Sequence, residues 1–179
     1  MNPTELQAEV LYSQLETELT SALAGMPKLA IVGIYSGGAW LAERLAKKLT
    51  ISDLGFVDVS FYRDDYAKRG LKEEVRPSQI PFDVEGANIV LVDDVLYTGR
   101  TTRAAINTLF DYGRPARIIL AALVDRGGRE LPISADFVAQ SIVLPNEQML
   151  VLQKADDGRL SLTIDLSLIH ISEPTRPER

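Results

Sequence analysis

Two adjacent carboxylates, Asp93 and Asp94, directly follow the apolar run Ile89 to Val92. An unbroken apolar run is typical of a central parallel strand that is covered on both faces, and ligands of such sheets bind beyond the carboxyl ends of the strands. We therefore expect this strand to end at the two acids, which would place their carboxylates at the mouth of a ligand site.

A second group of polar residues follows at once, in the segment Thr98-Gly99-Arg100-Thr101. Its hydroxyls, its glycine and the consecutive N–H groups at an expected helix start together favour the binding of an anion. Acids beside a phosphate cradle suit a ligand with both hydroxyls and a phosphate, such as ribose 5-phosphate. The plainer interpretation is a helix cap after an ordinary buried strand. ATP hydrolysis lacks its usual motif, because no Gly-x-x-x-x-Gly-Lys-Ser/Thr string occurs.

Strands and helices must alternate along the chain to position these groups. The spacing of apolar residues predicts helices over 4–23, from Gly37-Gly38 to Leu49, and from the Thr98 turn to Gly113 by way of Phe110. Apolar or alternating runs predict strands over 29–34, 56–61, 89–92, 118–124 and 137–144. This order predicts an α/β fold with a mainly parallel central sheet flanked by helices.

The segment from Arg63 to Val84 interrupts that alternation. It holds charges, Gly70, Pro77 and Pro81 without an apolar period. A connection this long in a compact domain is usually a functional lid or a binding loop. We expect a flexible lid that closes over the site.

The composition limits the chemistry of the chain. Its 179 residues include no cysteine and one histidine, so disulfides, zinc–thiolate sites and thiol nucleophiles are excluded. Any metal then needs oxygen ligands, which suits Mg²⁺. No apolar stretch approaches the roughly 20 residues of a membrane span, and the N-terminus lacks a signal-peptide pattern, so we expect a cytoplasmic protein. The net charge of -6 gives no global attraction to nucleic acid.

Three strings carry a resemblance to a known family. Val-Leu-Val-Asp-Asp-Val-Leu-Tyr-Thr-Gly-Arg-Thr (90–101) resembles the phosphoribosyl pyrophosphate (PRPP) signature of type I phosphoribosyltransferases. Ser-Phe-Tyr-Arg-Asp-Asp (60–65) and Leu-Val-Asp-Arg-Gly-Gly-Arg-Glu-Leu-Pro-Ile (123–133) narrow the resemblance to the PyrR group. Members of this group are uracil phosphoribosyltransferases and, in some bacteria, RNA-binding attenuators of pyrimidine operons.

The resemblance covers nearly all of 4–165 and implies a type I phosphoribosyltransferase fold. The implied reaction displaces pyrophosphate from C1 of PRPP by N1 of uracil, giving UMP, with Mg²⁺ delivered by PRPP. The implied catalytic residues are Asp93, Asp94 and Arg63. The implied contacts to PRPP and UMP are Ser36, Gly37, Asp93, Asp94, Val95, Leu96, Tyr97, Thr98, Gly99, Arg100, Thr101 and Thr102. The implied contacts to the base are Asp125, Arg126 and Val138.

Departures from related proteins bear on these roles. Purine relatives carry Lys at the place of Asp125 and usually Asp at the place of Tyr97, so a purine substrate is disfavoured. Gram-positive relatives commonly have Thr-Arg-Gly at the place of Ser36-Gly37-Gly38, so a cationic contact to pyrophosphate is missing, and Arg63 or the loop behind it would compensate for it. Plainer interpretations stay open: Val138 as core, and Arg126 with Arg129 as a solvated rim.

Other classes of function are also open. One is a UMP-responsive regulator that binds the leader RNA of a pyrimidine operon with little catalysis, which needs a basic surface. The first 27 residues contain no Lys or Arg, which argues against an RNA surface there. Another is a sensor that only binds PRPP or UMP. The family further implies a homo-oligomer, dimer or larger.

We expect a single domain over 1–166. The tail 167–179 breaks from the family's pattern and resembles translated vector sequence. His170 lies in this tail, so we expect no function for it.

Overall fold

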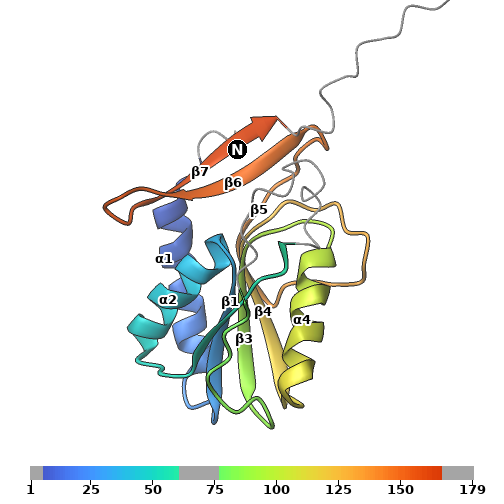
Figure 1. The fold of residues 1–179 in the computed structure, drawn as a ribbon. Coiled ribbons are helices and arrows are strands. Elements are labelled where there is room, and N and C mark those ends of the chain that lie inside the picture. The colour runs from blue at the N-terminus through green and yellow to red at the C-terminus, as the bar shows by residue number, and fades with distance from the viewer. Residues whose placement is uncertain (1–5, 61–76, 167–179) are drawn as a thin grey trace, which may run out of the picture.

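The computed structural model describes residues 6–60 and 77–166. A five-stranded parallel sheet forms its centre, in the order β2-β1-β3-β4-β5 (Figure 1). Its strands are β1 (Leu29–Ile34), β2 (Leu54–Val57), β3 (Asn88–Leu96), β4 (Arg117–Asp125) and β5 (Phe137–Ser141). The predicted α/β fold with a mainly parallel sheet is confirmed.

Helices cover both faces of this sheet. α1 (Ala8–Leu23) and α2 (Gly37–Leu49) lie on one face, and α4 (Arg100–Tyr112) lies on the other (Figure 1). Residues of β3 alternate between the two resulting cores: Val90 and Val92 pack on the side of α1 and α2, whereas Ile89 and Leu91 pack on the side of α4. A strand that is apolar on both faces therefore occupies the centre of the sheet.

The strand order reverses between β1 and β3. The chain leaves β1 for the edge strand β2 and returns on the other side of β1 as β3. Loops that leave the carboxyl ends of two such strands diverge and open a crevice for a ligand. Ser36-Gly37 follows β1, and the turn from Tyr97 follows β3, so the topology brings the segments implied to bind PRPP to the same crevice.

An antiparallel hairpin, β6 (Gln148–Lys154) and β7 (Leu160–Leu166), lies beyond the carboxyl end of the sheet (Figure 1). We did not predict it from the sequence. Its signal is the turn Asp156-Asp157-Gly158 between runs of alternating apolar residues, with Gly158 at φ +90°. Leu150, Leu152 and Leu160 bury the hairpin in the core that α1 and α2 share.

Glu9 of α1 and Arg44 of α2 fasten the turn of this hairpin to the helices. Arg44 donates to both carboxylate oxygens of Glu9, at 2.7 and 3.0 Å, and to the carbonyl of Gly158 at 2.6 Å. The N–H of Leu160 donates to Glu9 at 2.7 Å. The hydrogen bonds from Arg44 hold the pKa of the Glu9 carboxyl below its usual value, although burial opposes this shift.

Replacing Glu9 with glutamine should lower the free energy of unfolding by about 1 kcal/mol at pH 7, a modest value because solvent screens this partly exposed pair. A carboxyl whose pKa is lowered by folding stabilises the protein above its unfolded pKa, and this stability is lost as the pH falls through the folded pKa. Urea unfolding should therefore separate wild type from Glu9→Gln at pH 7 and bring them together below the usual carboxyl pKa of 4.5. A difference that is constant with pH would contradict the role of the charge.

Two predicted strands end earlier than expected. The strand predicted over 56–61 lies at 54–57, and the Asp58 carboxylate ends it by accepting the N–H of Ser60 at 2.9 Å. The strand predicted over 137–144 ends at Ser141. Phe110 lies in the predicted helix, and its side chain is 54% exposed. Within the described residues, no helix is long and apolar enough to cross a membrane.

Most of the predicted lid, including Arg63, lies outside the described residues. Its described end packs on the sheet: Gln79 exchanges two backbone hydrogen bonds of 2.8 Å with Phe56 of β2, and Val84 is buried. The described part of this segment is therefore anchored to an edge strand.

Candidate functional site

Strand β3 carries both predicted acids within its length. The prediction that the strand ends at Val92 was wrong, because pairing with β4 continues through Asp93 and Val95 to Leu96. The N–H of Asp94 donates to Oδ1 of Asp93 at 2.9 Å, and the N–H of Val95 donates to Oδ1 of Asp94 at 2.8 Å. Asp93 is 3% exposed and Asp94 is half-buried, so Asp94 is the more accessible acid.

Two glycines let the start of α2 approach β3 closely. A Cβ added to Gly37 would overlap the Asp94 carboxylate, and one added to Gly38 would overlap the carbonyl oxygen of Val92. Ser36 precedes them as the residue before α2. The structure thus sets the implied pyrophosphate loop directly against the implied ribose-binding acids.

The turn after β3 has the backbone form of an anion site. Gly99 lies at φ +93°, a left-handed conformation that favours glycine, and α4 begins at Arg100. Oγ1 of Thr98 accepts the N–H of Arg100 at 3.2 Å. The first N–H groups of a helix lack partners within the helix and attract anions. The Arg100 side chain pairs with Glu130 at 3.1 Å, so the donors of the turn outside this ion pair are its backbone N–H groups and hydroxyls.

Thr102 in the first turn of α4 is 1% exposed, and its hydroxyl has no hydrogen-bond partner among the described residues. A buried hydroxyl without a partner costs stability, so Thr102→Val should keep or raise the melting temperature of the ligand-free protein. If this hydroxyl serves the phosphate, the stabilisation that PRPP gives should shrink in the variant. A thermal melt with and without PRPP measures both. A large loss of stability without ligand would contradict the unpartnered state.

Two of the residues predicted to contact the base, Asp125 and Arg126, lie at the carboxyl end of β4, which we call the base end. Asp125 accepts the N–H of Gly127 at 2.9 Å and Nη2 of Arg129 at 2.6 Å. Burial opposes the charge of the Asp125 carboxyl, but these two hydrogen bonds outweigh it and lower its pKa. The interpretation of Arg129 as a solvated rim was wrong, since its side chain is only 23% exposed.

Arg126 is buried and not a solvated rim either. Its guanidinium lies 4.0 Å from the centre of the Tyr97 ring and donates to the carbonyls of Gln148 and Pro145 at 2.7 and 3.1 Å. The Tyr97 hydroxyl donates to Oδ1 of Asn146 at 3.1 Å. The segment that enters the hairpin therefore forms one wall beside the base end, a contribution that sequence analysis missed.

Val138 pairs with Ala122 of β4 and is half-buried in the edge strand β5. Its contact with a base stays a prediction, as does the catalytic role of Arg63 outside the described residues. The described residues bring together no group of three or more His, Cys, Asp or Glu side chains suited to a metal.

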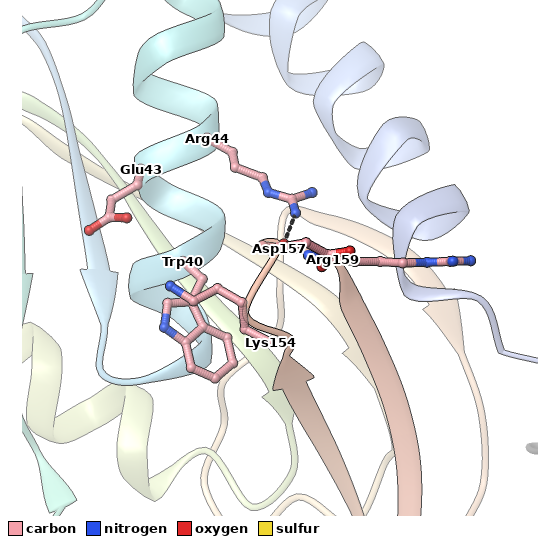
Figure 2. A pocket seen from close by; sticks show the side chains of 7 residues that line it. Trp40, Glu43, Arg44, Lys154, Asp157 and Arg159 are labelled. Carbon is pink, nitrogen blue, oxygen red and sulfur yellow. Dashed lines mark hydrogen bonds between the residues drawn. The ribbon is translucent and has the colours of Figure 1, made fainter.

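A separate cavity of about 500 Å³ opens between α2 and the hairpin turn (Figure 2). Arg44, which is hydrogen-bonded to Glu9 and Gly158, forms one side. The Lys154 ammonium lies 5.2 Å from the centre of the Trp40 ring. Its lining residues are Trp40, Glu43, Arg44, Lys154, Asp157, Gly158 and Arg159. None of these is a predicted site residue, so this cavity is distinct from the crevice at Asp94.

Comparisons with known proteins agree with this arrangement. Residues 13–150 match the model of the phosphoribosyl transferase domain. The bifunctional protein PyrR of Ralstonia nicotianae is 50% identical over 160 residues, which cover 88% of this chain and 92% of the relative. That of Nitrosococcus oceani is 51% identical over 153 residues, which cover 82% and 86%.

A solved hypoxanthine phosphoribosyltransferase from Trypanosoma cruzi superposes with a TM-score of 0.59 at 21% identity, covering 80% of this chain and 82% of the other. At this identity the likeness shows the fold. The family match and the close relatives go further: the chain belongs to the phosphoribosyltransferase family, in the group of the bifunctional PyrR proteins.

Proposed function

We propose that this chain transfers the phosphoribosyl group of PRPP to uracil, giving UMP and pyrophosphate. One observation carries the proposal: the Asp94 carboxylate lies against Gly37, while its own strand leads directly into the turn that opens α4. Groups suited to ribose hydroxyls, to pyrophosphate and to a 5-phosphate therefore meet at one edge of the sheet.

The acids act on the ribose. Asp93 and Asp94 accept hydrogen bonds from its 2- and 3-hydroxyls, and their charge favours the positive character that develops at C1 when the bond to pyrophosphate breaks. N1 of uracil forms the new bond to C1 as the bond from C1 to pyrophosphate breaks, and the N1 proton passes to the departing pyrophosphate or to water. The Thr98–Thr102 turn and the N-terminus of α4 hold the 5-phosphate, and the loop at Ser36-Gly37 admits pyrophosphate to close backbone contact.

Mg²⁺, delivered with PRPP, would supply positive charge to the departing pyrophosphate. A magnesium ion that takes most of its ligands from phosphates and water needs only one or two protein carboxylates. The crevice meets this requirement through one carboxylate, since Asp94 is half-buried rather than sealed, whereas Asp93 is 3% exposed. Asp94 would hold the ion.

Uracil rather than a purine is favoured at the base end. The chain has Asp125 where purine relatives carry Lys, and the Asp125 carboxylate is paired with Arg129. Tyr97 occupies the place of their usual Asp, and its hydroxyl is engaged with Asn146. Asp125, Arg126 and the backbone at Val138 would surround the base.

The test is to incubate the protein with PRPP, Mg²⁺ and each of uracil, hypoxanthine, guanine and orotate. UMP formed from uracil alone is the expected result. Turnover of hypoxanthine or guanine would overturn the assignment of the base. No turnover with any base, despite tight binding of PRPP or UMP, would favour a sensor.

RNA binding is the second candidate, because the relatives are named bifunctional. The chain would then bind the leader RNA of a pyrimidine operon in response to UMP. Binding that weakens steeply as salt rises is expected of such an interaction. No leader binding at low salt would reject it.

We further infer a cytoplasmic homo-oligomer. The family implies this assembly, and apolar side chains that remain exposed on the single chain, including Val143 at 90% and Phe110 at 54%, are available to its interface. Light scattering at working concentration should give a mass of at least two chains, and a monomer would contradict the inference.

A further inference from the structure

Backbone hydrogen bonds join the base end, at Asp125 and Arg126, to the phosphate end, which is the turn Thr98–Thr102. The N–H of Arg126 donates to the carbonyl of Leu96 at 3.0 Å, and the N–H groups of Glu130 and Leu131 donate to the carbonyl of Thr98 at 2.9 and 3.2 Å. The loop after β4, residues 126–133, therefore lies along the turn that precedes α4.

The Arg129 guanidinium lies at the centre of this junction. Nε donates to the carbonyl of Ile133 at 2.7 Å, Nη1 donates to the carbonyl of Tyr97 at 2.8 Å, and Nη2 donates to Asp125 at 2.6 Å. Ile133 in turn packs over Gly99, where an added Cβ would lie 3.3 Å from its side chain. One side chain thus contacts the end of β4, the start of the phosphate turn and the end of the loop.

The Asp125 carboxylate takes part in the same set of hydrogen bonds. Its Oδ1 accepts the Gly127 N–H and its Oδ2 accepts Arg129, so both carboxylate oxygens already have partners within the chain. The pair is largely shielded, with side-chain exposures of 23% and 22%. A hydrogen bond between charged groups in this setting is stronger than one between exposed groups. The carboxylate therefore serves to hold Arg129 in place.

We propose that Arg129 is a positioning residue that fixes the base end and the phosphate end of the site relative to one another. The inference rests on the proposed function, because it concerns a ligand that spans both ends. A UMP molecule gains affinity from two contacts only while the ends keep the right separation, and small displacements weaken such cooperation strongly.

Lysine cannot replace Arg129 in this role. The guanidinium is planar and sends donors along fixed directions to three acceptors, whereas an ammonium on a flexible chain is a point charge. Arg129→Lys therefore keeps the charge beside Asp125 and loses the geometry. Arg117→Lys is the matched control, because Arg117 is exposed at the opposite, amino-terminal end of β4.

The experiment titrates both variants and wild type with UMP, which spans the two ends, and with ribose 5-phosphate, which occupies the phosphate end alone. Arg129→Lys should weaken UMP binding by at least about tenfold and leave ribose 5-phosphate binding within about twofold. Arg117→Lys should change neither. Asp125→Asn, which keeps the acceptor and loses the charge, should show a smaller effect of the same kind, and thermal melts establish that each variant is folded.

Three results would overturn the inference. Equal losses for both ligands would mean that Arg129 only supports the fold, and unchanged UMP binding would mean that it positions nothing. An Asp125→Asn variant that weakens UMP binding more than Arg129→Lys would mean that the contact of Asp125 with the base, rather than the position of Arg129, controls the affinity. Failure of the proposed function looks different, since wild type itself would then bind ribose 5-phosphate no more weakly than UMP.

Discussion

Replacing Asp94 with asparagine is expected to lower kcat/KM for UMP formation roughly 10²- to 10³-fold, the usual range for loss of one preorganised charge at a transition state. Asparagine keeps the shape of the side chain and an oxygen that can accept the Val95 N–H, which now donates to Oδ1 of Asp94 at 2.8 Å. The local backbone should therefore survive. What is lost is the negative charge beside C1 of the ribose and one acceptor for its hydroxyls. Initial rates over a range of PRPP concentrations measure the effect.

Asp83→Asn is the matched control for this prediction. Asp83 makes the same type of contact, accepting the N–H of Glu85 at 3.0 Å, but it lies before β3 at the amino-terminal end of the sheet. Its variant should retain full activity. Asp93→Asn should also lose activity, because we propose that Asp93 binds the same ribose, and its Oδ1 accepts the N–H of Asp94. If Asp94→Asn turned over PRPP at the wild-type rate, the assignment of the acid pair would be wrong.

The sheet and its acid pair could be predicted because local sequence determines them. Ile89 to Val92 is apolar on both faces, and only a central parallel strand buries both faces. Helices between strands then require crossovers, which put every carboxyl end at one edge. The polar residues that follow β1, β3 and β4 had to gather there, and this geometry required no knowledge of the ligand.

The end of β3 could not be predicted, because it depends on a neighbour. Two acids usually stop a strand, yet pairing with β4 carries this one through Asp93 and Val95 to Leu96. The backbone of the acids is thereby fixed by the sheet rather than by a loop. Rigid strands place functional groups more accurately than loops do, which is an advantage for a site that must align two reactants.

The contacts of Arg126 and Arg129 also could not be predicted from the sequence. Two arginines in a Gly-rich segment are typical of exposed residues. Their side chains are shielded only because other segments cover them. The carbonyls of Gln148 and Pro145 accept hydrogen bonds from Arg126, and the carbonyl of Tyr97 accepts one from Arg129. These acceptors are backbone atoms of distant segments, so the residue types carry no signal for them.

Replacing Gly37 with alanine is the second large effect that we expect, with kcat/KM reduced about 10²-fold through misplacement of the reacting groups. The added Cβ would overlap the carboxylate of Asp94, so that side chain must leave the position that we propose for its contact with the ribose. Gly37 is the first residue of α2 and does not have a positive φ. Alanine suits a helix better than glycine by up to about 1 kcal/mol, which offsets part of the cost of the clash.

Activity should consequently fall far more than stability in Gly37→Ala, and this separation is the diagnostic result. Gly25→Ala supplies the opposite pattern: Gly25 has φ +76° and nothing within 4 Å of an added Cβ, so its replacement strains the backbone without touching the site. The Gly25→Ala variant should have a lower melting temperature and an unchanged kcat/KM. A Gly37→Ala protein that stayed fully active would show that Asp94 can leave Gly37 without loss, and the close approach of α2 to β3 would then serve packing alone.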